Sequence, residues 1–250
     1  MAKNKLKKFA EVNTLSNVIQ PQIEEVYQIE HELKGKWNEL FFKNSNPIVL
    51  ELGCGKGEYT IGLAERYPDK NFIGVDIKGA RIWKGAKYAS ERNLNNAGFL
   101  RMHIEHINSV FGQAEISEIW ITFPDPQLKR IRSKKRLTSS VFLSLYSKIL
   151  KSDGLIHLKT DSTRLFNYTT NLCDLNNLNV KYKSCDLYHS DLDDDILTIR
   201  TQYESLFLSQ GILIKYIQFT LNNLHNFEEP EEEDEELKRQ ESLAYISKIH

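Results

Sequence analysis

Between Pro47 and Thr160, short apolar runs alternate with longer amphipathic stretches, and this alternation limits the fold more than any other feature. The apolar runs are typical of buried strands and occupy residues 47–51, 72–75, 98–100, 119–123 and 155–158. The intervening helical patterns occupy residues 58–66, 79–92 and 138–151. A repeated strand, helix, strand order predicts an α/β fold, with a parallel sheet wrapped by helices.

The remaining elements are placed by turn signals and weaker patterns. Asp153-Gly154 predicts the end of the helix at 138–151 before the next strand begins. A further helix is expected at 162–176, and the final two strands are expected at 179–186 and 212–221.

A length of 250 residues with 40% apolar composition is enough for one domain of ordinary to large size with peripheral extensions. We expect that domain at 47–222. Residues 1–46 lack strong periodicity, apart from a short helix after Pro21, and are predicted to lie outside the main sheet. Residues 223–250 are expected to form an acidic tail.

The net charge of -1 would by itself argue against a nucleic-acid partner, but it averages over segregated blocks. Basic residues cluster at 3–8 and 129–136. Acidic residues gather around 191–195 and at 228–236, where eight of nine residues are Glu or Asp. The second acidic block is interpreted as a solvated tail or helix end, because charge runs seldom pack.

No apolar run is long enough to span a bilayer, and the lysine-rich start lacks the apolar stretch of a signal peptide. The cysteines, Cys54, Cys173 and Cys185, form no CxxC pair and leave one over, which argues against a disulfide framework and a cysteine zinc site. We therefore expect a cytoplasmic protein without a membrane partner or a bound metal.

A glycine-rich segment, Glu51-Leu52-Gly53-Cys54-Gly55-Lys56-Gly57, directly follows the first predicted strand. Its spacing is GxGxG rather than GxGxxG, and the acid at the strand end disfavours a pyrophosphate. Both features fit a cationic ligand without phosphate, such as S-adenosylmethionine. Asp76 ends the second strand, where an acid can accept hydrogen bonds from ribose hydroxyls. Cys54 is interpreted as a small packing residue, because nothing places a base beside it.

A second constellation starts with Phe123-Pro124-Asp125-Pro126, where the prolines force the chain out of the sheet. Asp125 therefore stands at the carboxyl end of a strand, where open α/β sheets bind ligands. Turn capping is the alternative role for this acid. Six basic residues follow within positions 129–136 and predict contacts to nucleic-acid phosphates, namely Lys129, Arg130, Arg132, Lys134, Lys135 and Arg136.

Taken together, the motifs resemble the bacterial tRNA (guanine-N7)-methyltransferase family from about Gly35 to Phe219. The motifs occur in order as Gly35-Lys36-Trp37, the glycine-rich segment, Phe72-Ile73-Gly74-Val75-Asp76, Phe123-Pro124-Asp125-Pro126 with Lys129 and Lys135-Arg136-Leu137, His157-Leu158-Lys159-Thr160-Asp161, and Thr201-Gln202-Tyr203-Glu204. The resemblance implies a Rossmann-like class I methyltransferase, with a mostly parallel seven-stranded sheet and an antiparallel last strand. It also implies methyl transfer from S-adenosylmethionine to N7 of guanine 46 in the tRNA variable loop.

The resemblance assigns roles residue by residue. It places the cofactor against Glu51, Gly53, Gly55, Asp76, Glu105 and Asp125. It places the nucleoside against Lys129, Asp161, Thr201, Gln202, Tyr203 and Glu204. Asp125 and Asp161 are the catalytic candidates, as fixed carboxylates near a developing cation. Without the family, Asp161 would be a helix N-cap and Thr201 to Glu204 the polar start of a helix.

Two positions depart from the family pattern. Glu105 stands where Asp is more common, and Gln127-Leu128 replaces Trp-Pro after Pro126. Two other functions are compatible with the residues: a methyltransferase acting on another RNA base or a small molecule, and a non-catalytic RNA-binding subunit of the same fold.

Overall fold

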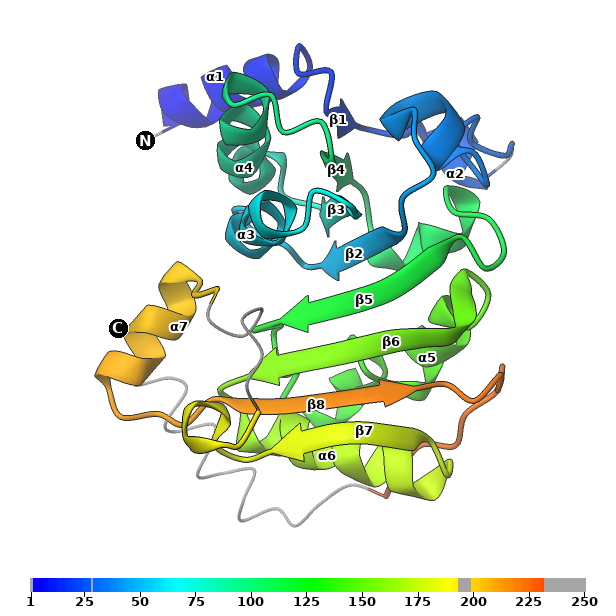
Figure 1. The fold of residues 1–250 in the computed structure, drawn as a ribbon, viewed down its shortest axis with the longest axis vertical. Coiled ribbons are helices and arrows are strands. Elements are labelled where there is room, and N and C mark those ends of the chain that lie inside the picture. The colour runs from blue at the N-terminus through cyan, green and yellow to red at the C-terminus, as the bar shows by residue number, and fades with distance from the viewer. Residues whose placement is uncertain (1, 28, 193–198, 232–250) are drawn as a thin grey trace.

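The computed structural model describes residues 2–27, 29–192 and 199–231, which form an eight-stranded sheet in the order β1-β4-β3-β2-β5-β6-β8-β7 (Figure 1). The strands are β1 Val18–Ile19, β2 Ile48–Leu52, β3 Asn71–Asp76, β4 Ala97–Arg101, β5 Ile116–Thr122, β6 Leu150–Thr160, β7 Asn179–Ser184 and β8 Lys215–Thr220. The pairs from β1 to β6 are parallel, and β8 runs antiparallel to both β6 and β7. The predicted mostly parallel sheet with an antiparallel last strand is confirmed.

The helices of the described chain are α1 Ala2–Val12, α2 Ile23–Tyr27, α3 Glu58–Arg66, α4 Gly79–Glu91, α5 Ser140–Tyr146, α6 Thr163–Leu175 and α7 Gln202–Ser209. Short helical turns add η1 Trp37–Phe42, η2 Ile104–Ser109, η3 Arg130–Lys135 and η4 Leu187–His189. Neighbouring residues of one strand point to opposite faces of the sheet. Val49 packs with apolar side chains of α3 and α4 on one face, whereas Leu50 packs with those of α5 and α6 on the other. Both faces of the sheet are therefore covered, as the apolar runs predict.

The prediction that residues 1–46 lie outside the sheet is wrong at one point. Val18 and Ile19 pair with Phe99 and Leu100 of β4 and form β1, the outermost strand on that side of the sheet. The sheet therefore has eight strands rather than seven. A two-residue strand leaves no periodic pattern in a sequence. Next to it, α1 is held on α4 by Glu11, which accepts hydrogen bonds from Trp83 Nε1 and Lys87 Nζ, each at 2.7 Å.

The predicted boundary at Asp153-Gly154 is also wrong. α5 ends at Tyr146, and β6 runs from Leu150 through this dipeptide to Thr160. The register against β5 shifts there, because Ile116 pairs with Leu150 whereas Glu118 pairs with Leu155. The dipeptide therefore forms an irregularity inside a strand rather than the end of a helix.

The acidic tail is only partly solvated in the described chain. The Glu229 carboxylate accepts hydrogen bonds from Ser140 N at 3.2 Å, from Ser140 Oγ at 2.9 Å and from Tyr168 Oη at 2.5 Å. Glu229 thus stabilises the start of α5, where helix N–H groups are unpaired. The rest of the acidic block, 232–236, and residues 193–195 lie outside the described residues.

This topology gathers the chemistry at one edge of the sheet. β2, β3, β5 and β6 are parallel, so the residues that follow them, from Gly53, Ile77, Phe123 and Asp161 onward, emerge on the same side. The arrowheads of β2, β5 and β6 point to the side on which α7 lies (Figure 1). Within the described ranges, no helix is long and apolar enough to cross a membrane.

Candidate active site

The glycine-rich loop turns the chain from β2 into α3 through three left-handed residues. Gly53, Gly55 and Gly57 have φ angles of 76°, 56° and 71°. This backbone region favours glycine, because a Cβ is strained there. At Gly57 a Cβ would also lie 2.5 Å from Cε1 of Phe99, so the loop packs directly on β4.

Glu51 lies beneath this loop with 3% of its surface exposed. Its carboxylate accepts hydrogen bonds from Thr60 N at 2.8 Å, from Thr60 Oγ1 at 2.5 Å and from Thr122 Oγ1 at 2.7 Å. Burial raises the pKa of Glu51 to about 7, although these hydrogen bonds oppose the shift. Glu51 thus ties β2, β5 and α3 together at the floor of the loop and also lines the small cavity above it.

Asp76 holds the other side of the loop. It accepts hydrogen bonds from Gly55 N at 3.0 Å and from Lys78 N at 2.8 Å, and it is 9% exposed. The loop after β2 and the turn after β3 are therefore joined by one carboxylate.

Three of the predicted acids meet in one cleft of about 340 Å³. Asp76, Glu105 and Asp125 line it together with Gly53, and Glu105 is 56% exposed. They come from β3, from η2 and from the turn after β5, and they have no adjacency in the sequence. A cleft with several carboxylates and a glycine loop suits a cationic ligand that also carries hydroxyl groups.

Sequence reasoning missed several other side chains of this cleft. Lys78 and Arg81 from the start of α4, and Met102 and His103 after β4, also line it. Their position after the ends of β3 and β4 was a usable signal, but none of them belongs to a recognisable motif.

Asp125 is exposed in the turn that follows β5. Its Oδ1 accepts a hydrogen bond from Gln127 N at 3.0 Å, so the turn-capping role is real. Phe123 and Gln127 on either side both have a φ of 48°, a strained conformation for residues with a side chain. The turn is therefore held in an uncommon shape that presents the Asp125 carboxylate at the mouth of the cleft.

Arg136 supports this turn from below, and the structure corrects its predicted role as a phosphate contact. It is 1% exposed, donates hydrogen bonds to the carbonyls of Pro126 and Gln127, each at 3.3 Å, and lies 4.3 Å from the Tyr168 ring centroid. The sequence could not separate this buried cation from its exposed neighbours, because all six stand in one run.

The other described cations of the run lie on the surface. Lys129, Arg132, Lys134 and Lys135 are exposed, in and beside η3, and Lys135 also lines the cleft. Ile131 is 91% exposed among them, so η3 itself has no apolar side chain packed beneath it at this point. The backbone of Arg130 belongs to the same turn.

The start of α7 forms another wall of the site. The Thr201 hydroxyl accepts a hydrogen bond from Glu204 N while the Glu204 carboxylate accepts one from Thr201 N, which is a capping box. Thr201 and Tyr203 line the same small cavity as Glu51 and Gly53, and Tyr203 is 51% exposed. The polar helix start expected from the residues alone is confirmed.

Gln202 connects α7 to the glycine loop. Its side-chain oxygen accepts a hydrogen bond from Lys56 Nζ, and its backbone N–H donates to Glu58 Oε2 at 2.7 Å. The predicted cofactor side and the predicted nucleoside side are thus in direct contact.

Glu204 differs from the sequence expectation of a direct substrate ligand. Its side chain is fully buried and lies 2.8 Å from Lys159 Nζ, so it offers no surface to a nucleoside in this structure. A carboxylate inside a polar motif gave no sign of burial in the sequence, because its cationic partner stands 45 positions earlier on β6.

Asp161 directly follows β6 and is half-buried at the same edge of the sheet. It is not the N-cap of α6. That role belongs to Ser162, whose hydroxyl accepts a hydrogen bond from Leu165 N. The Asp161 backbone carbonyl accepts from Lys215 Nζ at 3.1 Å, which fixes this turn to β8.

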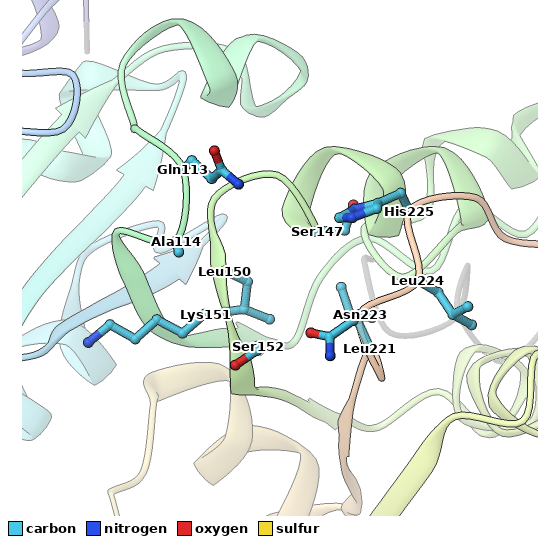
Figure 2. Close-up of a pocket in the computed structure, with 10 residues that line it drawn as sticks. All are labelled: Gln113, Ala114, Ser147, Leu150, Lys151, Ser152, Leu221, Asn223, Leu224 and His225. Atoms are coloured by element: carbon cyan, nitrogen blue, oxygen red, sulfur yellow. The ribbon is translucent and has the colours of Figure 1, made fainter.

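Another pocket, of about 310 Å³, lies at the opposite edge of the sheet (Figure 2). Its lining residues precede β5, start β6 or follow the antiparallel β8, and they include Gln113, Lys151 and His225. None of the predicted site residues lines it. In the part of the chain that the structure describes, no group of His, Cys, Asp and Glu could hold a metal ion.

The chain is similar to known methyltransferases. A family model described as "Putative methyltransferase" matches residues 45–216. The tRNA (guanine-N(7)-)-methyltransferase of Bacteroides fragilis is 51% identical over 235 residues, which cover 94% of this chain and 92% of that protein. The enzyme of the same name from Christiangramia forsetii is 52% identical over 221 residues, which cover 88% of this chain and 99% of that protein.

Among solved structures, the 16S rRNA methyltransferase KamB superposes with a TM-score of 0.57 at 14% identity, over 80% of this chain and 96% of that one. At this identity the match shows the fold alone, and the fold is that of a methyltransferase. The family model and the sequence relatives both span the cleft, the turn after β5 and the start of α7. The chain therefore belongs to the tRNA (guanine-N(7)-)-methyltransferase family.

Proposed function

We propose that this protein transfers a methyl group from S-adenosylmethionine to N7 of guanine 46 in the variable loop of tRNA. The observation that carries the proposal is the meeting of Asp76, Glu105 and Asp125 in one cleft, next to the wall formed by Thr201 and Tyr203. A cofactor side and a substrate side then share one edge of the sheet, where open α/β sheets bind ligands.

The residues of the cleft fit S-adenosylmethionine by their chemistry. Gly53 and Gly55 carry no side chain and let the protein backbone approach a ligand closely, Asp76 suits ribose hydroxyls, and the acids at Glu105 and Asp125 suit a cation. When bound, this cofactor supplies a methyl group on a positively charged sulfur. Transfer of that methyl group to the lone pair of guanine N7 would leave the electrons of the C–S bond on sulfur.

Guanine N7 carries no proton, so the reaction needs alignment rather than a general base. The transfer turns a neutral base into a cation while the sulfur loses its charge. Asp125 lies in the turn after β5 and Asp161 directly follows β6, so both carboxylates belong to this edge of the sheet and would stabilise positive charge on either side of the transfer. Lys129 would hold a phosphate or the guanine O6, because a donor on N7 would block methylation.

Exposed cations beside the cleft would supply the affinity for tRNA. Arg132, Lys134 and Lys135 lie in η3 and are exposed, and Arg130 belongs to the same turn. Contacts of this kind bind the RNA backbone without reading its sequence. Arg136 is left out of this set because it is buried.

The proposed reaction is tested with methyl-labelled S-adenosylmethionine and an unmodified tRNA transcript, followed by nucleoside analysis by mass spectrometry. We expect 7-methylguanosine, and none with a transcript in which guanine 46 is replaced by adenine. Equal incorporation into both transcripts would contradict the choice of position 46. Incorporation into another nucleoside would contradict the choice of N7.

The role of Asp125 is tested with two variants. Asp125→Asn keeps an oxygen that can accept from Gln127 N, so it preserves the turn and removes the charge. Asp125→Ala removes both. We expect both variants to lose methyl transfer while tRNA binding is retained. Wild-type turnover in Asp125→Asn would show that the carboxylate only caps the turn.

A further inference from the structure

Three elements that carry the proposed substrate residues converge on Lys159 of β6. The Lys159 carbonyl accepts a hydrogen bond from Phe123 N at 2.8 Å, at the first residue of the turn that presents Asp125. Lys159 stands two positions before Asp161. Its side chain reaches α7, where it meets Glu204.

The contact with Glu204 is a fully buried ion pair. Lys159 Nζ lies 2.8 Å from Glu204 Oε1, and both side chains have an exposed fraction of 0%. Tyr188 Oη donates to the same carboxylate oxygen at 2.5 Å, and Lys159 Nζ also donates to the Ile199 carbonyl at 3.3 Å. Burial lowers the pKa of Lys159, and the neighbouring Glu204 carboxylate opposes that shift.

The same carboxylate closes the capping box of α7. Glu204 Oε2 accepts from Thr201 N at 3.4 Å, so the ammonium that orients Glu204 also orients the N-cap residue of the helix. Glu204 is the one buried residue within α7, whereas Phe207 and Leu208 are only partly buried. The Phe207 ring lies 5.9 Å from the Phe123 ring, centroid to centroid. The start of α7 is therefore fixed by polar bonds rather than by a large apolar contact.

A buried ion pair is a poor source of stability, because desolvation offsets the attraction, and apolar residues of similar volume often do as well. Apolar residues, however, do not orient a helix start as hydrogen bonds do. The orientation of the start of α7 matters here, because Thr201 and Tyr203 line the cavity above the glycine loop. Gln202 is bonded to Lys56 of that loop and to Glu58, the first residue of α3.

We propose that Lys159 is a positioning residue for methyl transfer. Through the buried pair with Glu204 it holds Thr201 to Tyr203 over the cofactor loop, in a fixed position relative to the Asp125 turn. The inference rests on the proposed function, since it assigns the start of α7 to the nucleoside side. The Lys159 side chain is fully buried and offers no surface to cofactor or RNA, so it would act through Glu204. Its effect is on the rate of the bound complex, because exposed cations elsewhere supply the affinity for RNA.

Lys159→Met tests the inference, because methionine keeps most of the length and volume but removes the charge. We expect the single-turnover rate at saturating tRNA to fall about 10- to 100-fold, the range that a misplaced reactive group produces. The dissociation constants of tRNA and of S-adenosylmethionine should stay within about threefold of wild type. Tyr188→Phe removes a single bond to Glu204 and should give a smaller loss of rate in the same direction.

The double variant Lys159→Met/Glu204→Gln separates positioning from folding. Glutamine still accepts the capping-box bond, and the unpaired buried charge of the single variant is gone. We expect the melting temperature to return toward the wild-type value while the rate at saturating tRNA remains low. If the rate returned together with the melting temperature, the pair would be purely structural and the inference would be overturned.

Lys70→Met is the matched control. Lys70 directly precedes β3, and its Nζ pairs at 2.7 Å with Glu118 of β5, away from the strand ends that carry the site; the two side chains are 27% and 16% exposed. This variant should keep the wild-type rate at a temperature at which it is folded. An unaltered rate in Lys159→Met would refute the inference alone, whereas an inactive wild type would refute the proposed function and leave the pair's contacts untouched.

Discussion

Neutralising the exposed cations of η3 should change the salt dependence of tRNA binding by a predictable amount. The perturbation is the triple variant Arg132→Gln, Lys134→Gln and Lys135→Gln. These side chains are exposed beside the cleft, whereas Arg136 of the same run is buried and is deliberately kept. If each of the three neutralises one phosphate, the slope of log K against log salt should become shallower by ~2.1 to ~2.7.

Over a fourfold rise in salt, from about 50 to about 200 mM, that change in slope is a factor of ~20 to ~40. The variant should therefore bind far more weakly than wild type at low salt and approach it at high salt. Filter binding at five or six salt concentrations with one unmodified tRNA gives both slopes. The rate at saturating tRNA should change much less than the affinity.

The control is a second triple variant with the same change of net charge. Lys148, Lys151 and Lys181 are exposed, and they lie away from the cleft, near the start of β6 and on β7. Their replacement by glutamine should leave the slope close to that of wild type, because distant charges are screened at these salt concentrations. Equal slopes for wild type and the η3 variant, or equal losses in both variants, would refute the assignment of η3 to the RNA interface.

Three further predictions concern the cofactor side and the start of α7. Burial raises the pKa of Glu51 from 4.5 to about 7, so between these pH values the folded state holds a proton that the unfolded state releases, and this group's contribution to stability should fall as pH rises. Glu51→Gln should flatten that fall in urea unfolding at several pH values. An unchanged profile would contradict the raised pKa. Gly57→Ala should lower the melting temperature and weaken S-adenosylmethionine binding in calorimetry, because the alanine Cβ would lie 2.5 Å from Phe99. Wild-type behaviour of this variant would show that the loop can shift. Thr201→Ala should cost about 1 kcal/mol in urea unfolding by removal of the α7 cap, and Thr201→Ser, which keeps the hydroxyl, should cost clearly less.

Local patterns predicted the parts of this fold that are built locally. The helix at 58–66 has the expected bounds, and the strand expected at 72–75 is extended by one residue at each end. Both are signalled by contacts among near neighbours along the chain. β1 gave no such signal, because two residues next to an irregular segment have no period, and pairing with β4 decides their structure.

The candidate site follows the same division. The place of Asp76 and Asp125 at the carboxyl ends of parallel strands was predictable, because Asp76 follows the apolar run 72–75 directly and Asp125 follows the run 119–123 after one proline. The partners of the buried charges were not predictable, because Lys159 and Glu204 are 45 positions apart and belong to different elements. Arg136 illustrates the limit within a single run, since the bonds to Pro126 and Gln127 that bury it depend on the turn after β5.

Four buried charged side chains stand behind the cleft rather than in it: Glu51, Arg136, Lys159 and Glu204. Each holds a backbone segment that carries a proposed ligand or adjoins one. Glu51 bonds Thr60 of α3, the helix that follows the glycine-rich loop, and Arg136 bonds the Asp125 turn. Lys159 pairs with Glu204 at the start of α7. Desolvation makes such groups costly, and apolar residues would fill the same volume. Hydrogen-bonded charges fix orientation as well as position, which apolar packing alone does more loosely. A reaction that depends on alignment therefore accounts for the place of these groups in the fold better than stability does.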